Sequence, residues 1–121
     1  MQIDMKIKEG VSILYPPHRF DIGCSVSFQA KIDNVLSMSD GPLLINFDSV
    51  AYVSSAILGA IFTAARVFCL EGRPVAVCSV GEGVMRVLDS LEFFDLVPVY
   101  RSEAEAIDAF SCVPGLKPRI I

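Results

Sequence analysis

Short apolar runs and amphipathic stretches alternate along the whole chain. In residues 3–8, apolar and charged positions alternate one by one, which is typical of a half-buried strand. Glu9 and Gly10 predict a tight turn, and residues 11–15 predict the returning strand of a hairpin. Pro16 and Pro17 end this hairpin, because proline cannot donate a ladder hydrogen bond.

Three further apolar runs predict strands at residues 43–47, 75–80 and 96–100. Each is short, nearly continuous and bounded by turn residues, a pattern that favours strands buried in a parallel sheet. Residues 50–53 add a short linker after the first of these strands.

Segments whose apolar residues have helical spacing alternate with these strands. A first helix is predicted from Ser25 to about Met38, a second follows Ser54 and Ser55, and a third follows Gly81-Glu82-Gly83. A fourth begins at the capping box formed by Ser102 and Glu105 and extends to about Phe110. The order strand-strand-helix-strand-helix-strand-helix-strand-helix predicts an α/β fold. We expect a central mixed sheet of four to five strands with four helices.

The second helix carries the most informative pattern. Serine before a long apolar segment is typical of a helix N-cap. At 100° per residue, one side of the helix is apolar and forms the expected core face, made of Ile57, Ala60, Ile61, Ala64 and Phe68. Near Ser55, the opposite side carries Leu58, Gly59, Phe62 and Arg66. If this side is exposed, we expect it to be a docking surface.

The segment Tyr-Val-Ser-Ser-Ala-Ile-Leu-Gly-Ala-Ile at residues 52–61 resembles the signature of STAS domains, the family of bacterial anti-sigma factor antagonists. In that family, Asp-Ser-Ser-Gly-Leu or Ser-Ser-Ala-Gly-Leu follows an aromatic and an aliphatic residue, and a kinase phosphorylates the second position. The resemblance implies phosphorylation of Ser55, with Ser54 as the second choice. It covers about residues 3–110 and implies one STAS domain at residues 1–110, followed by a loosely ordered tail at 111–121.

A second part of the resemblance lies in the loop His18-Arg19-Phe20-Asp21. The family usually has Gly-Arg-Leu-Asp there, beside the phosphorylated serine, which makes Asp21 a candidate site residue. The chain departs from the family where Asn46 replaces a usual aspartate of the central strand and Ile57 replaces a glycine. The expected partner-binding residues are Asp21, Ser54, Ser55, Leu58, Gly59, Phe62 and Arg66.

The resemblance also implies partners. They are an anti-sigma factor that is a serine protein kinase of the histidine-kinase-like ATPase fold, and a PP2C-type phosphatase that resets the serine. The unphosphorylated domain would bind the kinase and so release its target. The alternative is a non-switching STAS subunit of a larger signalling or lipid-transport complex. A homodimer remains open.

Charge and cysteine usage exclude other functions. The net charge is −4 and the ten basic residues are scattered, which disfavours binding to nucleic acid. The four cysteines contain no Cys-x-x-Cys pair, and His18 is the only histidine, so we expect reduced thiols, no metal site and no cofactor.

We expect a cytoplasmic protein without catalytic activity. No apolar run approaches the ~18 residues of a membrane span, and residues 1–8 lack the pattern of a signal peptide. A serine nucleophile would require a base that only His18 could supply, and the chain has no Gly-x-Ser-x-Gly motif.

Overall fold

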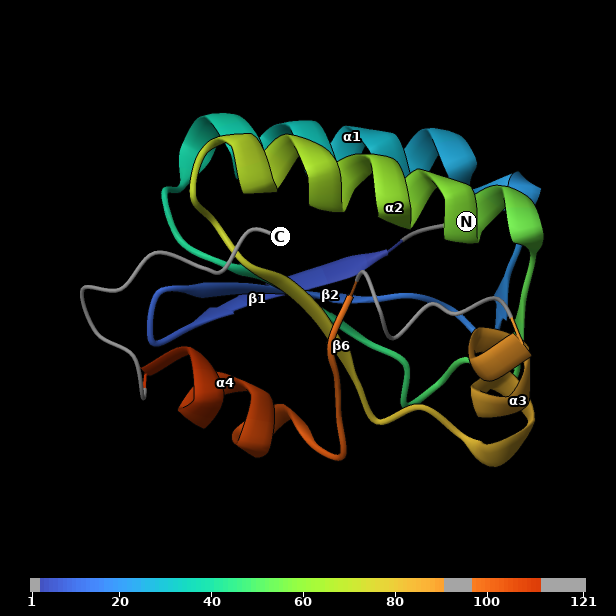
Figure 1. The fold of residues 1–121 in the computed structure, drawn as a ribbon. Coiled ribbons are helices and arrows are strands. Elements are labelled where there is room, and N and C mark those ends of the chain that lie inside the picture. Colours follow the sequence, from blue (N-terminus) through green and yellow to red (C-terminus); the bar gives the residue numbers. More distant parts are fainter. Residues whose placement is uncertain (1–2, 91–96, 112–121) are drawn as a thin grey trace.

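The computed structural model describes residues 3–90 and 97–111 (Figure 1). Strands β1 (Asp4–Lys8) and β2 (Val11–Tyr15) form the predicted antiparallel hairpin. Glu9 and Gly10 have φ angles of 50° and 80°. Two successive positive φ angles are the requirement of a type I′ turn, whose twist matches that of the paired strands.

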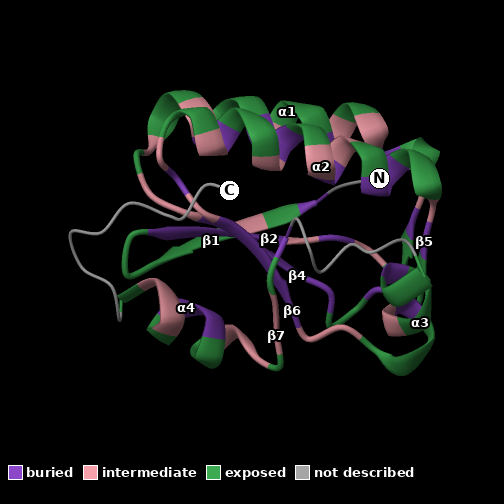
Figure 2. Ribbon diagram, in the orientation of Figure 1, coloured by how far each residue is buried: buried purple, intermediate pink, exposed green. Residues whose placement is uncertain are grey.

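The other strands of the main sheet run parallel to β2. They are β4 (Leu43–Asn46), β6 (Val75–Cys78) and β7 (Val99–Tyr100), and the sheet order is β1-β2-β4-β6-β7. All four residues of β4 are buried, as expected for the central strand of a sheet that is covered on both faces (Figure 2).

Helices cover both faces of this sheet. α1 (Ser25–Met38) and α2 (Ser55–Leu70) lie side by side across one face, and α4 (Glu103–Ser111) lies against the other (Figure 1). α3 (Glu82–Ser90) packs against the short strand β5 (Tyr52–Val53). The predicted α/β fold with a mixed sheet is confirmed, and residues 3–90 and 97–111 contain four α-helices and five strands in the main sheet.

The structure adds a second, smaller sheet that the sequence pattern did not predict. Strand β3 (Arg19–Phe20) pairs in parallel with β5, where we expected a loop and a linker. A 3₁₀ helix, η1 (Ile22–Cys24), then leads into α1. Strand β6 also ends two residues earlier than predicted, because Ser79 has a φ of 60°, a left-handed conformation that breaks an extended strand.

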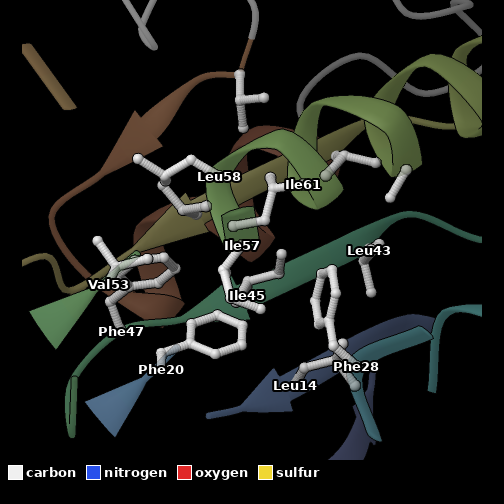
Figure 3. Close-up of a cluster of buried hydrophobic side chains, with 14 of the residues drawn as sticks. Leu14, Phe20, Phe28, Leu43, Ile45, Phe47, Val53, Ile57, Leu58 and Ile61 are labelled. Atoms are coloured by element: carbon white, nitrogen blue, oxygen red, sulfur yellow. The ribbon is translucent and has the colours of Figure 1, made fainter. Parts of the chain in front are cut away.

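Two apolar clusters fill the two sides of the sheet. The larger lies between the sheet and the pair α1 and α2, where the ring of Phe20 forms T-shaped contacts with Phe28 and Phe47 at centroid distances of 5.5 and 6.0 Å (Figure 3). The smaller lies under α4, where Ile107 packs with Ile13 and Leu44.

Some predictions fall on residues that the structure does not describe. These are Leu91 of the third helix, Leu96 of the last strand, and the predicted tail apart from Ser111, which ends α4. The single domain at residues 1–110 therefore stays a prediction. No helix in residues 3–90 or 97–111 is both long and apolar enough to span a membrane.

Candidate functional site

Ser54 is the N-cap of α2. Its backbone is extended, with φ −89° and ψ 158°, and its hydroxyl oxygen accepts a hydrogen bond of 3.2 Å from the backbone N–H of Ile57. Its own N–H donates to the carbonyl of Phe20 at 3.1 Å. The half-buried Ser54 side chain therefore satisfies one of the free N–H groups at the start of the helix.

Ser55 is the first residue of α2, and its surroundings are different. The residue is exposed, and its hydroxyl makes no hydrogen bond within the described parts of the chain. The positive end of the helix dipole favours negative charge at this position. The sequence alone could not separate the two serines, whereas the structure gives Ser54 a structural contact and leaves the Ser55 hydroxyl accessible.

The small sheet brings residues of the β3 loop to the start of α2. Arg19 pairs with Tyr52 and Phe20 with Val53, so Asp21 follows at the level of Ser54. One carboxylate oxygen of Asp21 accepts from the backbone N–H of Gly23 at 3.0 Å and caps η1. The other accepts from Nε of Arg19 at 2.9 Å. The predicted proximity of Asp21 to the serines is therefore present in the fold.

The face of α2 near Ser55 is only partly exposed. Gly59 and Arg66 are exposed, while Phe62 is half-buried against the larger cluster. The expectation that Leu58 faces a partner is wrong, because its side chain is 1% exposed and points into the cluster beside Ile57 (Figure 3). α2 contacts α1, β6 and η1. These neighbours enclose more of the helix circumference than the core face of five residues that the sequence predicted.

Gly59 has no structural reason within the described chain to be glycine. A Cβ built there meets nothing within 4 Å, and its φ is not in the left-handed region. A glycine inside an exposed helix costs about 1 kcal/mol relative to alanine. The absence of a side chain four residues after Ser55 lets another molecule approach the helix backbone closely.

Three exposed apolar side chains near this site were missed by the sequence analysis. Ile22 is 68% exposed, Val26 is 82% exposed and Tyr52 is 46% exposed. They belong to η1, the first turn of α1, and β5, which are the segments around the start of α2. The sequence did hold a signal for Val26, because it lies about 200° around the helix from the buried Phe28.

We call Arg19, Asp21, Ile22, Tyr52, Ser55 and Gly59 the Ser55 surface. It combines a charged pair, two exposed apolar side chains, a free hydroxyl and a bare helix backbone. Such a mixture is common in surfaces that bind other proteins.

The same region offers no arrangement for metal binding or nucleophilic catalysis. Within residues 3–90 and 97–111, no three or more His, Cys, Asp or Glu side chains gather as a metal-binding group. Cys24 and Cys78 are buried and Cys69 is half-buried, all as free thiols, and Cys112 lies outside the described residues. In these ranges Ser55 has no hydrogen bond to His18 or to any other base.

A second polar cluster lies between the sheet and α4. The carboxylate of Glu103 accepts hydrogen bonds from Lys8 Nζ and Tyr15 Oη, both at 2.6 Å, and from Asn46 Nδ2 at 2.9 Å. We call these four residues the Glu103 cluster. An ionised aspartate at position 46 could not donate, so the departure from the family at Asn46 has a local reason.

The Glu103 cluster shifts the pKa values of its members. Desolvation raises the pKa of Glu103, but the hydrogen bonds from Lys8, Tyr15 and Asn46 and the positive charge of Lys8 outweigh it and lower the pKa to about 2. Desolvation and then the bond to Glu103 raise the pKa of Tyr15. Desolvation, with a smaller contribution from the Glu103 charge, raises the pKa of the nearby Cys78 thiol to about 11.

Comparisons with known proteins agree with the resemblance in sequence. A family model described as the STAS domain matches residues 2–106. An anti-sigma F factor antagonist from Paenibacillus polymyxa is 25% identical over 114 residues, which are 93% of this chain and 97% of that protein.

Solved structures share the fold. An anti-sigma-factor antagonist (STAS) domain protein from Planctomyces limnophilus has a TM-score of 0.83 at 16% identity, over 92% of this chain and 99% of that chain. SpoIIAA, a Bacillus cell fate determinant solved in its phosphorylated form, has a TM-score of 0.66 at 15% identity, over 88% of this chain and 97% of that chain.

Proposed function

This chain belongs to the STAS domain family, and from this premise we propose that it is a phosphorylation-switched binding module of a bacterial partner-switching pathway. The unphosphorylated form binds an anti-sigma factor that is also a serine kinase of the histidine-kinase-like ATPase fold, and the kinase then releases its own target. Phosphorylation of Ser55 ends this binding, and a PP2C-type phosphatase restores it. We expect this cycle of binding, phosphorylation and dephosphorylation to take place in the cytoplasm.

The accessibility of Ser55 carries the proposal. A kinase must reach the hydroxyl, and Ser55 offers one that is exposed and unbonded in the described chain, whereas the hydroxyl of Ser54 caps α2. The relatives named as anti-sigma factor antagonists support the binding role, and SpoIIAA in a phosphorylated form supports phosphorylation on this fold.

The partner binds the Ser55 surface. The exposed apolar side chains of Ile22 and Tyr52 supply area that becomes favourable when it is covered. Gly59 allows the partner backbone to approach α2, and Arg66 and Phe62 extend the contact along the helix. Leu58 contributes only from the core, by holding the first turns of α2 in place.

The switch follows from where the phosphate charge is placed. A phosphoserine carries about −1.5 to −2 charges, and the N-terminus of a helix favours such charge by about 0.3 to 1 kcal/mol, so the free domain tolerates it. In a covered interface the same dianion loses its water. Burying a dianion that no single side-chain cation balances costs several kcal/mol, roughly enough to abolish binding.

The proposal is tested by binding and phosphate mapping with the ATPase-type anti-sigma factor of the same genome. We expect Ser55→Ala to bind the kinase as the parent does, and Ser55→Asp to bind at least about tenfold more weakly, which corresponds to about 1.4 kcal/mol. Isothermal titration calorimetry gives the affinities. Mass spectrometry after incubation with kinase and ATP should locate the phosphate on Ser55.

Equal binding of Ser55→Asp and the parent would contradict the switch. A chain that remains unphosphorylated at Ser55 and yet binds the kinase would instead support the non-switching subunit. Lys31→Gln, which removes a charge from α1 outside the Ser55 surface, is the matched control for a general charge effect.

A further inference from the structure

Arg19 is the cation of the Ser55 surface, and most of its hydrogen-bonding capacity is unused. Its side chain is 65% exposed, and within the described residues only Nε is hydrogen-bonded, to Asp21 at 2.9 Å. The guanidinium lies over the ring of Tyr52, with Cζ 4.7 Å from the ring centroid. The two terminal nitrogens are therefore held in a defined orientation without a bonded acceptor of their own.

The register of the small sheet places Arg19 on the strand beside the one that leads into Ser55. β3 and β5 run in parallel, with Arg19 opposite Tyr52, and the hydrogen bond from Ser54 N–H to the Phe20 carbonyl continues the pairing. Three residues at about 3.3 Å each and one strand spacing of about 4.8 Å place the Cα of Ser55 within about 11 Å of the Cα of Arg19. Because Arg19 reaches forward to Asp21, its side chain extends in the direction of the helix start.

We propose that Arg19 is the counter-ion of phosphorylated Ser55, an inference that rests on the proposed function only in taking Ser55 as the site of the phosphate. The terminal nitrogens of Arg19 bind two phosphate oxygens, the paired geometry that a guanidinium and a phosphate favour. Asp21 and Tyr52 act as positioning residues, since they hold Nε and the face of the guanidinium.

The arrangement also resolves a conflict of charge. Without Arg19, the phosphate would lie beside the carboxylate of Asp21, and the two negative groups would repel each other. A guanidinium that bonds Asp21 through Nε and the phosphate through its other nitrogens lies between the two negative groups and weakens their repulsion. The phosphorylated surface would then lose Arg19 as a contact for the partner, in addition to gaining the phosphate.

Other charged groups lie on the elements next to the site, and the cations among them provide the control variants. They are His18 beside β3, Asp48 before β5, Arg66 on α2, and Glu82, Arg86 and Asp89 on α3. Arg66 lies eleven residues after Ser55, about 16 Å further along the helix at 1.5 Å per residue. Arg86 is the rival cation, because α3 packs against β5.

The experiment uses the full chain with phosphoserine placed at position 55 during translation. The second pKa of the phosphate, ordinarily about 6, is measured by ³¹P NMR titration in the parent, Arg19→Gln, Arg66→Gln and Arg86→Gln. We expect Arg19→Gln to raise that pKa by about 0.5 unit or more, because the cation that favours the dianion is gone. The two control variants should stay within ~0.2 unit of the parent. Thermal melting of each variant checks that the fold is retained.

A second signal tests the contact directly. In ¹H–¹⁵N spectra of the guanidinium groups, the Arg19 signals should shift when serine at position 55 is replaced by phosphoserine, and those of Arg66 should not. An unchanged phosphate pKa in Arg19→Gln, or a rise in Arg86→Gln alone, would overturn the inference. Because the phosphate is introduced without a kinase, either result leaves the proposed switch to be judged by its own binding experiment.

Discussion

At the scale of single residues, Ser54 and Ser55 are chemically identical and have different structural roles. Ser54→Ala removes the hydroxyl that accepts from the Ile57 N–H, so we expect the free energy of unfolding to fall by about 1 kcal/mol. Ser55→Ala removes a hydroxyl with no partner in the described chain, and we expect a change within about 0.5 kcal/mol. Urea denaturation of the two variants measures the difference, and equal losses would contradict the division of roles.

The sequence predicted where several residues of the candidate site lie, and for some of them it also predicted the structural role. A serine cap at the start of α2 could be predicted, because capping chemistry is local in sequence, but which of the two serines forms it could not. Asp21 beside the serines was expected only from the family resemblance. Leu58 was placed on the wrong side, since a helical wheel gives directions but not how much of the circumference its neighbours enclose. Arg19 was assigned no role, because its orientation depends on β5, a strand more than thirty residues later.

At the scale of elements, Arg73 joins the C-terminal ends of α1 and α2. Its guanidinium is buried and donates to the carbonyls of Gly41 and Val35 at 2.9 and 3.2 Å and to the hydroxyl of Ser39 at 3.1 Å. It also lies over the ring of Phe68, 4.5 Å from the centroid. One side chain thus satisfies carbonyl groups at the end of α1 and in the following loop while packing on α2.

Replacing Arg73 should therefore destabilise the fold. We expect Arg73→Met, which keeps the apolar length, to lower the free energy of unfolding by about 3 kcal/mol, because two carbonyl groups lose a charged donor. Arg101→Met, at an exposed arginine, is the matched control and should change little. Chemical denaturation gives both values, and a loss below ~1 kcal/mol for Arg73→Met would show that water replaces the guanidinium adequately.

The elements differ in how far they could be predicted. The apolar spacing of α1 and α2 repeats over many residues, so α1 begins at Ser25 as predicted and α2 begins at Ser55, one residue before the predicted start. β3 and β5 have two residues each, too few for any periodicity, and pairing across the fold creates them. The early end of β6 depends on the backbone of Ser79, a residue type that does not by itself indicate a positive φ.

At the scale of the whole molecule, the Glu103 cluster connects α4 to three strands of the sheet. The pKa of Glu103 is about 2 in the folded chain, below the 4.5 expected without these contacts. A carboxyl group with a depressed folded pKa stabilises the fold above its unfolded pKa, and this contribution is lost as the pH falls towards the folded value. The chain should therefore lose stability between pH 4.5 and about 2.

Glu103→Gln tests this dependence, since the amide has no titrating proton in that range. We expect the variant to be less stable than the parent at pH 7, and its stability to change less between pH 4.5 and 2. Thermal melts across this range measure both effects. Parallel curves for the parent and the variant would show that other carboxyl groups govern the response to acid.

The order of strands and helices, and with it the α/β fold, follows from the sequence because crossover connections leave few arrangements. The Glu103 cluster does not follow, because its members come from β1, β2, β4 and α4 and have no common motif. Asn46 stood out only as a departure from a family pattern, and the carboxylate that explains it lies 57 residues later in the chain.

The separation of the two serine hydroxyls has a consequence for genetics. A screen that selects variants by how well they fold would detect position 54 and pass over position 55, since only the former holds a backbone group of the helix. Substitutions at position 55 would be constrained only by the interactions of this protein with other proteins. A mutation that removes the Ser55 hydroxyl would leave the abundance and melting temperature of the protein normal. Its defect would appear only when a partner protein is present.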